Sequence, residues 1–259
     1  MSKTAIITGA TSGIGAAFAR RLAQDGYDLV ITGRKKDIIQ KLADDLSQQH
    51  NIKVTVIIAE LSNDSDFNKL ADAVKTREDI EILINNAGYS GYDRHFEEVD
   101  IAEHEKMVKL LQVVPMRLVS LIVPGMIKRG KGAIINVSSA GSFLPISTVS
   151  VYGGSKAFLK YYSQSLWQEL KDKNIKVQAL CPGFTETNFG KDYYSKETYQ
   201  KIKKFMRSPE KVVEYSISSL KKNKPVCIPG ISTWLLAKMF PALPWGIYCW
   251  MGRRMLPFK

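Results

Sequence analysis

The apolar positions of the chain form short runs that alternate with longer segments of helical periodicity. The short runs are rich in Val, Ile and Leu, which is typical of strands that are buried on both faces. They cover residues 4–8, 27–32, 52–60, 81–88, 133–138, 175–180 and 225–230. Segments of helical spacing lie between them, among others at 38–49, 64–76, 101–127 and 152–172, with Pro115 as the expected kink of the third. This alternation predicts an α/β fold in which helices cover both faces of a parallel, doubly wound sheet of about seven strands.

The first strand leads into a glycine-rich turn that is followed by a helical segment. Gly9, Gly13 and Gly15 have the spacing that permits a tight turn, a close approach of the backbone to a pyrophosphate, and close packing of the helix on the strand. The N-terminus of the helix would present unpaired N–H groups to a phosphate. Because a strand precedes the turn and a helix follows it, we favour dinucleotide binding by a Rossmann-like fold over a plain connecting turn.

The end of the second strand carries basic residues. An acidic residue at this place would bind the ribose 2′-hydroxyl of NAD, whereas an arginine suits the 2′-phosphate of NADP. No acid stands there, and Arg34 is followed by Lys35. The pair therefore favours NADP(H) over NAD(H). The alternative is that both residues only solvate the start of the next helix.

Composition narrows the class of protein. A hydrophobic content of 45% with 24% charged residues indicates an ordered globular chain, and 259 residues suit a single domain, residues 1–259. Three widely spaced cysteines predict reduced thiols in a cytoplasmic protein and no metal site. The first residues lead straight into a strand, so we expect no secretory leader.

The net charge of +12 fits an anionic cofactor, an acidic carrier protein or an anionic membrane. No nucleic-acid-binding motif accompanies it, so we expect no nucleic acid partner.

The candidate catalytic residues lie between the end of the fifth strand and the start of the helix that follows it. Tyr152 and Lys156 are four residues apart at the start of a helical segment, so they share one face. A nearby ammonium favours the phenolate and lowers the pKa of the tyrosine, which makes Tyr152 a candidate proton donor or acceptor. Ser139 directly follows the fifth strand, where a hydroxyl can reach a ligand. The alternative for the pair alone is a surface lysine beside a half-buried tyrosine.

Five motifs together resemble those of the short-chain dehydrogenase/reductase family over about residues 3–230. They are TGATSGIG (8–15), NNAG (85–88), Ser139 thirteen residues before Tyr152, YGGSK (152–156) and PGFTET (182–187). The resemblance implies an oxidoreductase that moves a hydride between nicotinamide and a carbonyl or alcohol. It gives Tyr152 the role of proton donor to the developing alkoxide and Ser139 that of hydrogen-bond donor to the substrate oxygen. Lys156 would lower the pKa of Tyr152 and hold the nicotinamide ribose.

The same resemblance assigns the cofactor-binding positions. Glu60 stands where the family usually has Asp near the adenine, Asn86 and Gly88 would flank the cofactor, and Thr187 would touch the nicotinamide carboxamide. The full set for NADP(H) is Gly9, Thr11, Ser12, Gly13, Ile14, Gly15, Arg34, Lys35, Glu60, Leu61, Asn86, Ala87, Gly88, Tyr152, Lys156, Pro182, Gly183, Thr185 and Thr187.

One position departs from the family pattern. Many members carry an Asn on the long helix before the fifth strand, and this Asn anchors a water that relays protons. Alignment places Leu111 there, and a leucine side chain holds no water. Either the neighbouring Gln112 compensates, a shifted alignment hides the Asn, or the proton is delivered by another route.

Residues 188–208 fall where the family places its substrate-covering segment. Phe189 and Tyr193 in this segment, with Phe143 and Phe184 outside it, are candidates for an apolar substrate pocket under a lysine-rich rim. Ordinary core packing is the alternative for each of them. Such a pocket suits a small-molecule substrate such as a bulky apolar ketone, or a long-chain acyl thioester on CoA or acyl carrier protein.

The last segment, residues 231–259, holds three of the four tryptophans and is rich in other apolar residues. Lys238, Pro241 and Pro244 interrupt it, so it lacks the uninterrupted apolar stretch of a spanning helix. Trp and Tyr mixed with Lys and Arg suit a segment that lies on a membrane surface. The alternative is that it packs over the substrate pocket or a subunit interface.

These observations predict an NADPH-dependent reductase of an apolar ketone or 3-oxoacyl thioester, cytoplasmic or peripheral at the membrane. A hydroxysteroid-type or other secondary-alcohol dehydrogenase is the alternative enzyme. A catalytically weak NADP(H)-binding sensor or scaffold is the alternative outside the enzymes. By resemblance we also expect a homodimer or homotetramer that pairs through the helices at 101–127 and 152–172.

Overall fold

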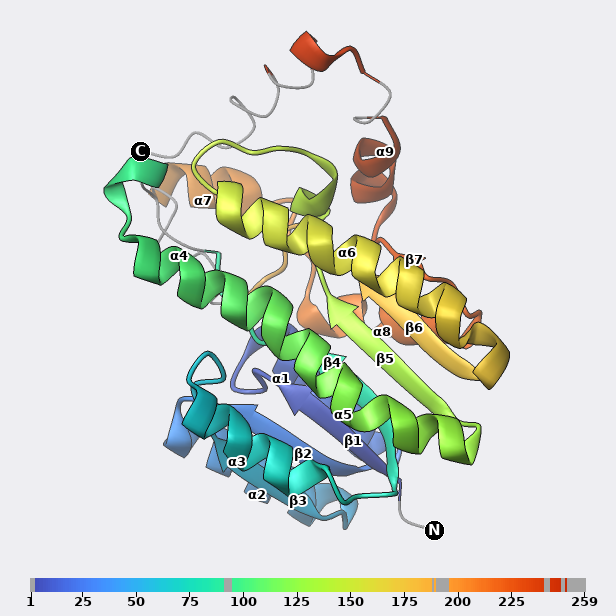
Figure 1. The fold of residues 1–259 in the computed structure, drawn as a ribbon. Helices are drawn as coiled ribbons and strands as arrows, with labels where there is room; N and C mark the ends of the chain where they lie inside the picture. The colour runs from blue at the N-terminus through green and yellow to red at the C-terminus, as the bar shows by residue number, and fades with distance from the viewer. Residues whose placement is uncertain are drawn as a thin grey trace.

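A single parallel sheet organises the part of the chain that the structure describes. The computed structural model describes residues 3–90, 95–187, 189, 196–239, 243–247 and 250. Its sheet has the strand order β3-β2-β1-β4-β5-β6-β7 (Figure 1). The strands are β1 (Thr4–Thr8), β2 (Asp28–Gly33), β3 (Val54–Ile58), β4 (Ile80–Asn85), β5 (Gly132–Val137), β6 (Ile175–Leu180) and β7 (Val226–Cys227). The predicted fold class, a Rossmann-like doubly wound sheet, is confirmed.

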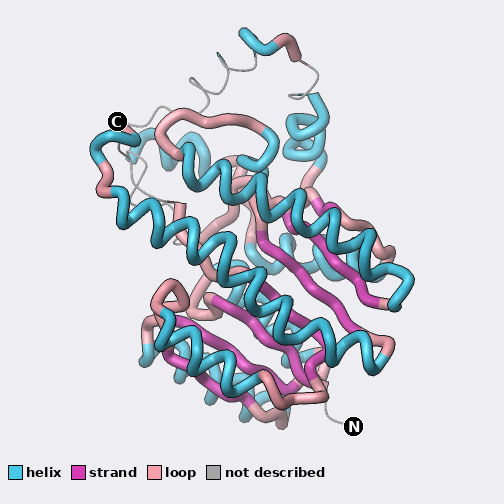
Figure 2. The backbone as a smooth tube through the Cα atoms, viewed as in Figure 1, coloured by secondary structure: helices cyan, strands magenta, loops and turns pink. Residues whose placement is uncertain are grey.

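Helices form a layer on each side of the sheet (Figure 2). They are α1 (Gly13–Gln24), α2 (Lys36–His50), α3 (Asp64–Val74), α4 (Ile101–Val108), α5 (Val114–Arg129), α6 (Ser150–Leu170), α7 (Lys196–Lys203), α8 (Pro209–Lys221) and α9 (Ile231–Met239). Side chains of α1, α2 and α8 pack on one face of the sheet, and those of α3, α5 and α6 pack on the other.

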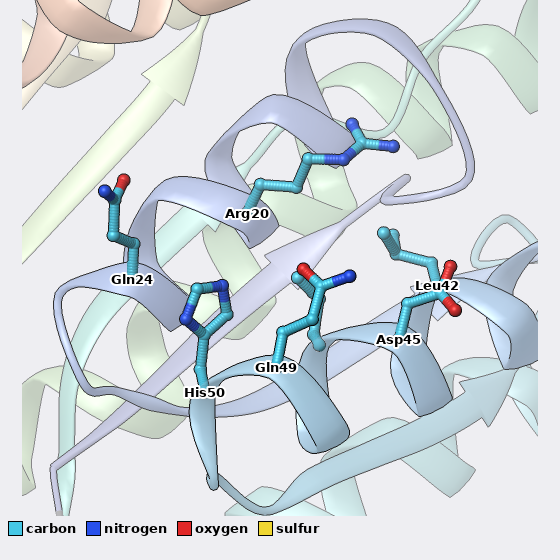
Figure 3. Close-up of a pocket in the computed structure, with 7 residues that line it drawn as sticks. Arg20, Gln24, Leu42, Asp45, Gln49 and His50 are labelled. Atoms are coloured by element: carbon cyan, nitrogen blue, oxygen red, sulfur yellow. The ribbon is translucent and has the colours of Figure 1, made fainter.

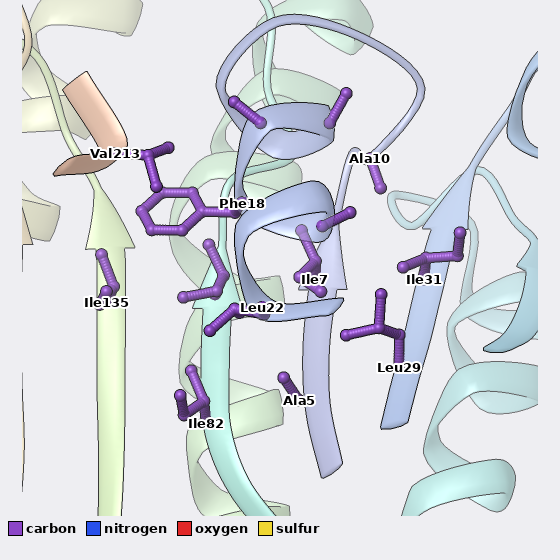
Figure 4. Close-up of a cluster of buried hydrophobic side chains, with 14 of the residues drawn as sticks. Ala5, Ile7, Ala10, Phe18, Leu22, Leu29, Ile31, Ile82, Ile135 and Val213 are labelled. Atoms are coloured by element: carbon purple, nitrogen blue, oxygen red, sulfur yellow. The ribbon is translucent and has the colours of Figure 1, made fainter. Parts of the chain in front are cut away.

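The two hydrophobic cores follow from alternation along the strands. Ile7 of β1 points into the first core, where it meets Phe18 and Leu22 of α1 (Figure 4). Its neighbour Ile6 points to the opposite face and joins Leu83 of β4 in the second core. Because both faces of each central strand are covered, both sets of side chains must be apolar. This is why the strands read as unbroken apolar runs.

The long helical stretch before β5 is interrupted once. Helix α4 continues into a π-helical turn, Lys109–Val113, and then into α5. The interruption lies one turn before Pro115, because a proline ring clashes with the carbonyl of the residue four positions earlier, which is Leu111. The stretch Ile101–Arg129 is long and apolar enough to cross a membrane, but Leu118, Ile122 and Met126 are buried in the second core. We interpret it as a core helix.

Candidate active site

The carboxyl ends of the central strands meet at one edge of the sheet, where the glycine turn follows β1 and the NNAG motif follows β4. Thr8 joins the two strand ends: its Oγ1 accepts hydrogen bonds from the amides of Asn86 (2.9 Å) and Ala87 (3.0 Å). The side-chain amide of Asn86 donates in turn to the carbonyls of Thr8 (2.9 Å) and Gly9 (3.0 Å). Asn86 therefore holds the glycine turn in place, and its amide group is committed to that task. Thr8 was missed from the sequence as a supporting residue, because its partners lie 78 and 79 residues away.

The glycines of this turn have no room for a side chain. A Cβ atom on Gly9 would lie 2.8 Å from the Cα of Ala87, and one on Gly15 would lie 2.3 Å from the carbonyl oxygen of Gly9. Gly9 and Gly13 also adopt φ values of +69° and +57°, which L side chains rarely adopt. The backbone of the turn can thus come close to a ligand.

Helix α1 begins at Gly13 with conditions that suit a phosphate. Its cap residue Ser12 makes no side-chain hydrogen bond to the helix, and the first turn contains no acidic residue. The amides of a first helical turn lack partners within the helix and carry the positive end of the helix dipole. The turn, with its close backbone and unpaired amides, therefore fits the pyrophosphate of a dinucleotide.

Arg34, at the end of β2, lies beside Glu60. Its Nη1 is 3.0 Å from Glu60 Oε2, and its side chain remains 63% exposed, so the guanidinium keeps donors that face solvent. Burial opposes ionisation of Glu60, but hydrogen bonds from Ser62 and Arg34 outweigh it and lower the pKa of Glu60. A Cβ on Gly33 would lie 2.5 Å from Thr11 Cγ2, which places the glycine turn directly against this strand end. The amides of the glycine turn and an exposed arginine therefore lie close together, at the ends of the neighbouring strands β1 and β2.

Lys156 and Tyr152 lie on successive turns of α6. The ammonium of Lys156 donates to the carbonyl of Val137 (2.7 Å), and the residue is 4% exposed. Burial lowers the pKa of Lys156 to about 8. Its Nζ is 5.7 Å from the centre of the Tyr152 ring. The structure thus brings the two predicted residues together, with the cation fixed by the end of β5.

Ser139 follows β5 and begins a 3-10 turn, Ala140–Phe143. Its Oγ accepts from the amide of Gly141 (3.0 Å), which fixes the hydroxyl oxygen and leaves the hydroxyl proton to be donated. A Cβ on Gly153 would be 3.9 Å from the carbonyl oxygen of Gly141, so this turn packs on the first turn of α6 that carries Tyr152. The preceding Ser138 donates to the carbonyl of Lys156 (2.7 Å). Two contacts therefore tie the serine turn to α6.

A second buried lysine, Lys160, supports the turn that follows Ser139. This residue was not predicted from the sequence. It is 6% exposed, and its Nζ donates to the carbonyl of Ser142 (3.0 Å). The Nζ also lies 4.0 Å from the centre of the Phe143 ring and 4.5 Å from that of Tyr161. Burial lowers the pKa of Lys160. Helical spacing places it one turn beyond Lys156, but its partner carbonyl could not be deduced from that spacing.

Leu111 lies against the site, as the alignment predicts. A Cβ on Gly88 would be 2.7 Å from Leu111 Cδ2 and 3.7 Å from Lys156 Nζ, so the three residues converge. Leu111 is buried within the π-helical turn. Gln112 donates from Nε2 to the hydroxyl of Ser155 (3.0 Å), so its amide is already engaged with α6.

The remaining predicted cofactor positions divide into two groups. Thr187 lies against the glycine turn, since a Cβ on Gly13 would be 2.7 Å from its Cγ2. Lys35 is exposed at the cap of α2, and Thr185 donates to the carbonyl of Gly183 (3.0 Å). Three positions contribute packing instead: Ile14 packs against the first core, Leu61 belongs to the second, and Pro182 is buried.

The predicted substrate residues are placed as follows. Phe189 is 47% exposed, and its ring centre lies 6.0 Å from that of Tyr152. Phe184 is 39% exposed after β6, and Phe143 is half-buried beneath Lys160. Tyr193 lies outside the described residues. Of these rings, that of Phe189 lies beside Tyr152.

Two hollows accompany these elements. One of about 400 Å³ borders the glycine turn and is lined by Ser12, Gly13, Arg20, Glu186, Thr187, Tyr199, Lys203, Pro209 and Glu210. The other, of about 200 Å³, lies between α1 and α2 and is lined by Arg20, Gln24, Leu42, Asp45, Leu46, Gln49 and His50 (Figure 3). Only the first includes predicted cofactor residues. We therefore associate the first hollow with the site.

Comparison with known proteins identifies the family. Short chain dehydrogenases match residues 3–198. A very-long-chain 3-oxoacyl-CoA reductase from Rattus norvegicus is 32% identical over 210 residues, which cover 78% of this chain and 67% of that protein. The chain therefore belongs to the short chain dehydrogenases, which are oxidoreductases, and the family predicted from the motifs is confirmed.

Solved structures agree with this assignment. A short-chain dehydrogenase from Sphingobium yanoikuyae in complex with NADPH has a TM-score of 0.83 and 30% identity, covering 93% of this chain and 94% of that one. The bulky-bulky ketone specific alcohol dehydrogenase from Comamonas testosteroni has a TM-score of 0.79 and 29% identity, covering 93% of this chain and 92% of that one. The likeness thus extends over nearly the whole chain.

Proposed function

We propose that the protein uses NADPH to reduce the 3-oxo group of a long-chain acyl thioester, or a similarly bulky ketone, to a secondary alcohol. The observation that carries this proposal is the buried Lys156 ammonium, fixed by the Val137 carbonyl one helical turn from Tyr152. The relatives support the reaction and the substrate class, because they include a 3-oxoacyl-CoA reductase and an alcohol dehydrogenase for bulky ketones. The exposed rings of Phe184 and Phe189 suit an apolar substrate.

NADP(H) is the cofactor that the residues fit, and the solved relative in complex with NADPH supports this choice. The backbone of the glycine turn and the first amides of α1 hold the pyrophosphate. Arg34 pairs with the 2′-phosphate through the donors that its contact with Glu60 leaves free. When bound, NADPH supplies the hydride that reduces the substrate carbon. The other contributions come from side chains of this protein.

Ser139 and Tyr152 act on the substrate oxygen. The Ser139 hydroxyl, whose oxygen accepts from the Gly141 amide, donates its proton in a hydrogen bond to the carbonyl oxygen and so orients it. As negative charge develops on that oxygen, the phenol of Tyr152 transfers its proton to it, and the product leaves as the alcohol. The cation of Lys156 stabilises the phenolate that remains on Tyr152. This tyrosine must then regain a proton before the next turnover.

The supply of that proton does not run through the side chain of residue 111. Leu111 offers no hydrogen-bonding group, and the amide of Gln112 is engaged with Ser155. The backbone offers a substitute: residue 115 is proline, so the carbonyl of Leu111 has no amide four residues ahead to accept from. We propose that this carbonyl takes the place of the missing asparagine side chain in holding a water near Lys156.

The first experiment measures NADPH oxidation by the purified protein. The panel contains 3-oxoacyl-CoA thioesters of increasing chain length, steroid ketones and small diketones, each with wild-type protein and Tyr152→Phe. We expect turnover that rises with chain length, prefers NADPH to NADH, and falls at least about a hundredfold in the variant. If only steroid ketones were turned over, the substrate class would be steroids and not acyl thioesters. Tight NADPH binding without turnover of any carbonyl would identify a sensor and contradict the reductase.

A further inference from the structure

Helix α9 has an apolar outer face. Four apolar side chains of this helix are exposed: Ile231 (78%), Trp234 (47%), Leu235 (45%) and Met239 (57%). Their spacing places them on one side of the helix. The segment that follows continues this character: Trp245, Ile247 and Trp250 are 73%, 49% and 56% exposed. A surface helix of a globular protein normally turns polar residues outward. Here the outer side is apolar, which marks an interaction surface.

The inner side of α9 packs beside the active site. A Cβ on Gly183 would lie 2.8 Å from Thr233 Oγ1, and Ala237 on the same side of the helix is only 6% exposed. The carbonyl of Pro182 accepts from the amide of Ala140, in the turn that follows Ser139 (2.8 Å). Helix α9 therefore lies next to the turn that follows the catalytic serine. Figure 1 shows α9 at the same end of the molecule as the carboxyl ends of β5 and β6.

A basic turn adjoins the start of this helix. Side-chain atoms of Arg207 pack against Gly230, the residue before α9. Arg207 follows Lys203, Lys204 and Phe205, and Phe205 is 77% exposed. Lys203 lines the same hollow as Glu186 and Glu210. Lys204 and, on α9 itself, Lys238 are exposed as well.

We propose that the outer face of α9 and the basic turn (residues 203–207) bind to an anionic lipid bilayer, so that the entrance of the active site faces the membrane. Exposed Trp with flanking Lys suits the interface between lipid tails and headgroups. A second copy of this chain is disfavoured on this face, because a symmetric contact would gather Lys204 and Lys238 of both copies at one interface, and α9 has no acidic residue to pair with them. If the proposed function holds, a long acyl chain can enter the site from the bilayer without crossing water.

The test is flotation of the full-length protein with lipid vesicles. We expect wild-type protein to float with vesicles of phosphatidylcholine and phosphatidylglycerol, to float less with phosphatidylcholine alone, and to bind less as salt rises. The double variant Trp234→Ser with Leu235→Ser should lose at least about tenfold in partitioning. Lys204→Gln and Lys238→Gln should each lose about fivefold on the anionic vesicles.

Ile101→Ser is the matched control, since Ile101 is 64% exposed on α4 and lies outside the proposed face. It should float as wild-type protein does. Wild-type protein that floats with neither vesicle would overturn the proposal. The proposal would also fall if the Trp234/Leu235 double variant floated as well as wild-type protein does. It would fall likewise if light scattering showed a dimer for wild-type protein and a monomer for this variant, since the face would then be a subunit interface. Flotation without reductase activity would leave the membrane surface standing and contradict the proposed function instead.

Discussion

The ammonium of Lys156 is held where burial opposes its charge. The carbonyl of Val137 accepts a hydrogen bond from it, and burial lowers the pKa of Lys156 to about 8 from an ordinary value of 10.5. Such a group can lose its proton within a range in which most lysines stay charged. The site therefore keeps a cation beside Tyr152 near neutral pH, at a cost to the stability of the free protein.

This cost predicts how stability changes with pH. Between pH 8 and 10.5 the unfolded chain binds more protons than the folded protein at Lys156, so the free energy of unfolding rises with pH across that window. Relative to Lys156→Met, the wild-type protein should gain up to about 3 kcal/mol from pH 8 to above 10. Urea unfolding of both proteins, without cofactor, measures the difference at each pH.

The comparison with Lys156→Met removes the contributions of groups that do not interact with Lys156, because these groups titrate alike in both proteins. The lost hydrogen bond to Val137 lowers the stability of the variant by a similar amount at every pH. A difference between the two proteins that stays constant over the window would show that Lys156 is not desolvated as the structure indicates.

Lys160 is a positioning residue for Ser139 through the turn that both residues share. Its Nζ donates to the Ser142 carbonyl, and its buried stem lies over Phe143. Lys160→Met keeps the length of the side chain but removes the donor, so the serine turn loses its support. We expect kcat to fall about tenfold, with the Kd for NADPH unchanged.

Lys160→Arg is the matched variant, because it restores a cationic donor at the same place. It should recover most of the lost kcat. Thermal unfolding of both variants serves as the structural measurement, since a generally loosened fold would lower the melting temperature and the NADPH affinity together. Equal kcat for Lys160→Met and wild-type protein would remove Lys160 from the catalytic arrangement.

At the scale of elements, the glycine turn between β1 and α1 can be tested for its contribution to NADPH binding. Gly13 combines a φ of +57° with a close neighbour, Thr187, whereas Gly26 has a φ of +75° and no heavy atom within 4 Å of an added Cβ. An alanine at either position has the same type of backbone strain, about 1 to 2 kcal/mol. Only at Gly13 would it also push on a residue at the cofactor edge.

Gly13→Ala should therefore weaken NADPH binding at least about tenfold, while Gly26→Ala should leave it unchanged and lower only the stability. Fluorescence titration with NADPH gives the affinity, and chemical unfolding gives the stability. If both variants bound NADPH as wild-type protein does, the turn would not approach the cofactor as closely as its geometry suggests.

At the scale of the whole molecule, much of the fold could be predicted because each central strand is covered on both faces. That burial forces unbroken apolar runs, which mark the strands in the sequence, and parallel order then brings Gly9, Ser139 and the start of α6 to one edge. Helical spacing placed Tyr152 and Lys156 on one face, and this placement made Tyr152 a candidate for proton transfer. Family resemblance added the developing alkoxide as the acceptor of that proton and the contact of Lys156 with the nicotinamide ribose.

The rest depends on contacts between distant residues. The partners of Thr8 lie more than 70 residues along the chain, and the carbonyl that Lys160 holds belongs to a different element. No periodicity encodes such pairs. Pro115 was expected to kink the long helix, and the irregular turn before it is centred on Leu111, because the steric conflict falls four residues before the ring. The outer face of α9 likewise required the structure, since composition does not tell which side of a helix is covered.

The central place of β1 in the sheet has a consequence for how the protein is made. Of the strands in this sheet, β1 is synthesised first, yet one of its two neighbours, β4, begins 76 residues after Thr4. At a synthesis rate of about 5 to 20 residues per second, β1 waits several seconds with that edge open. The turn that would receive the pyrophosphate gains its second wall only when Asn86 and Ala87 arrive. During biogenesis, cofactor capture therefore follows closure of the sheet centre, and the nascent N-terminal half is a natural client for chaperones.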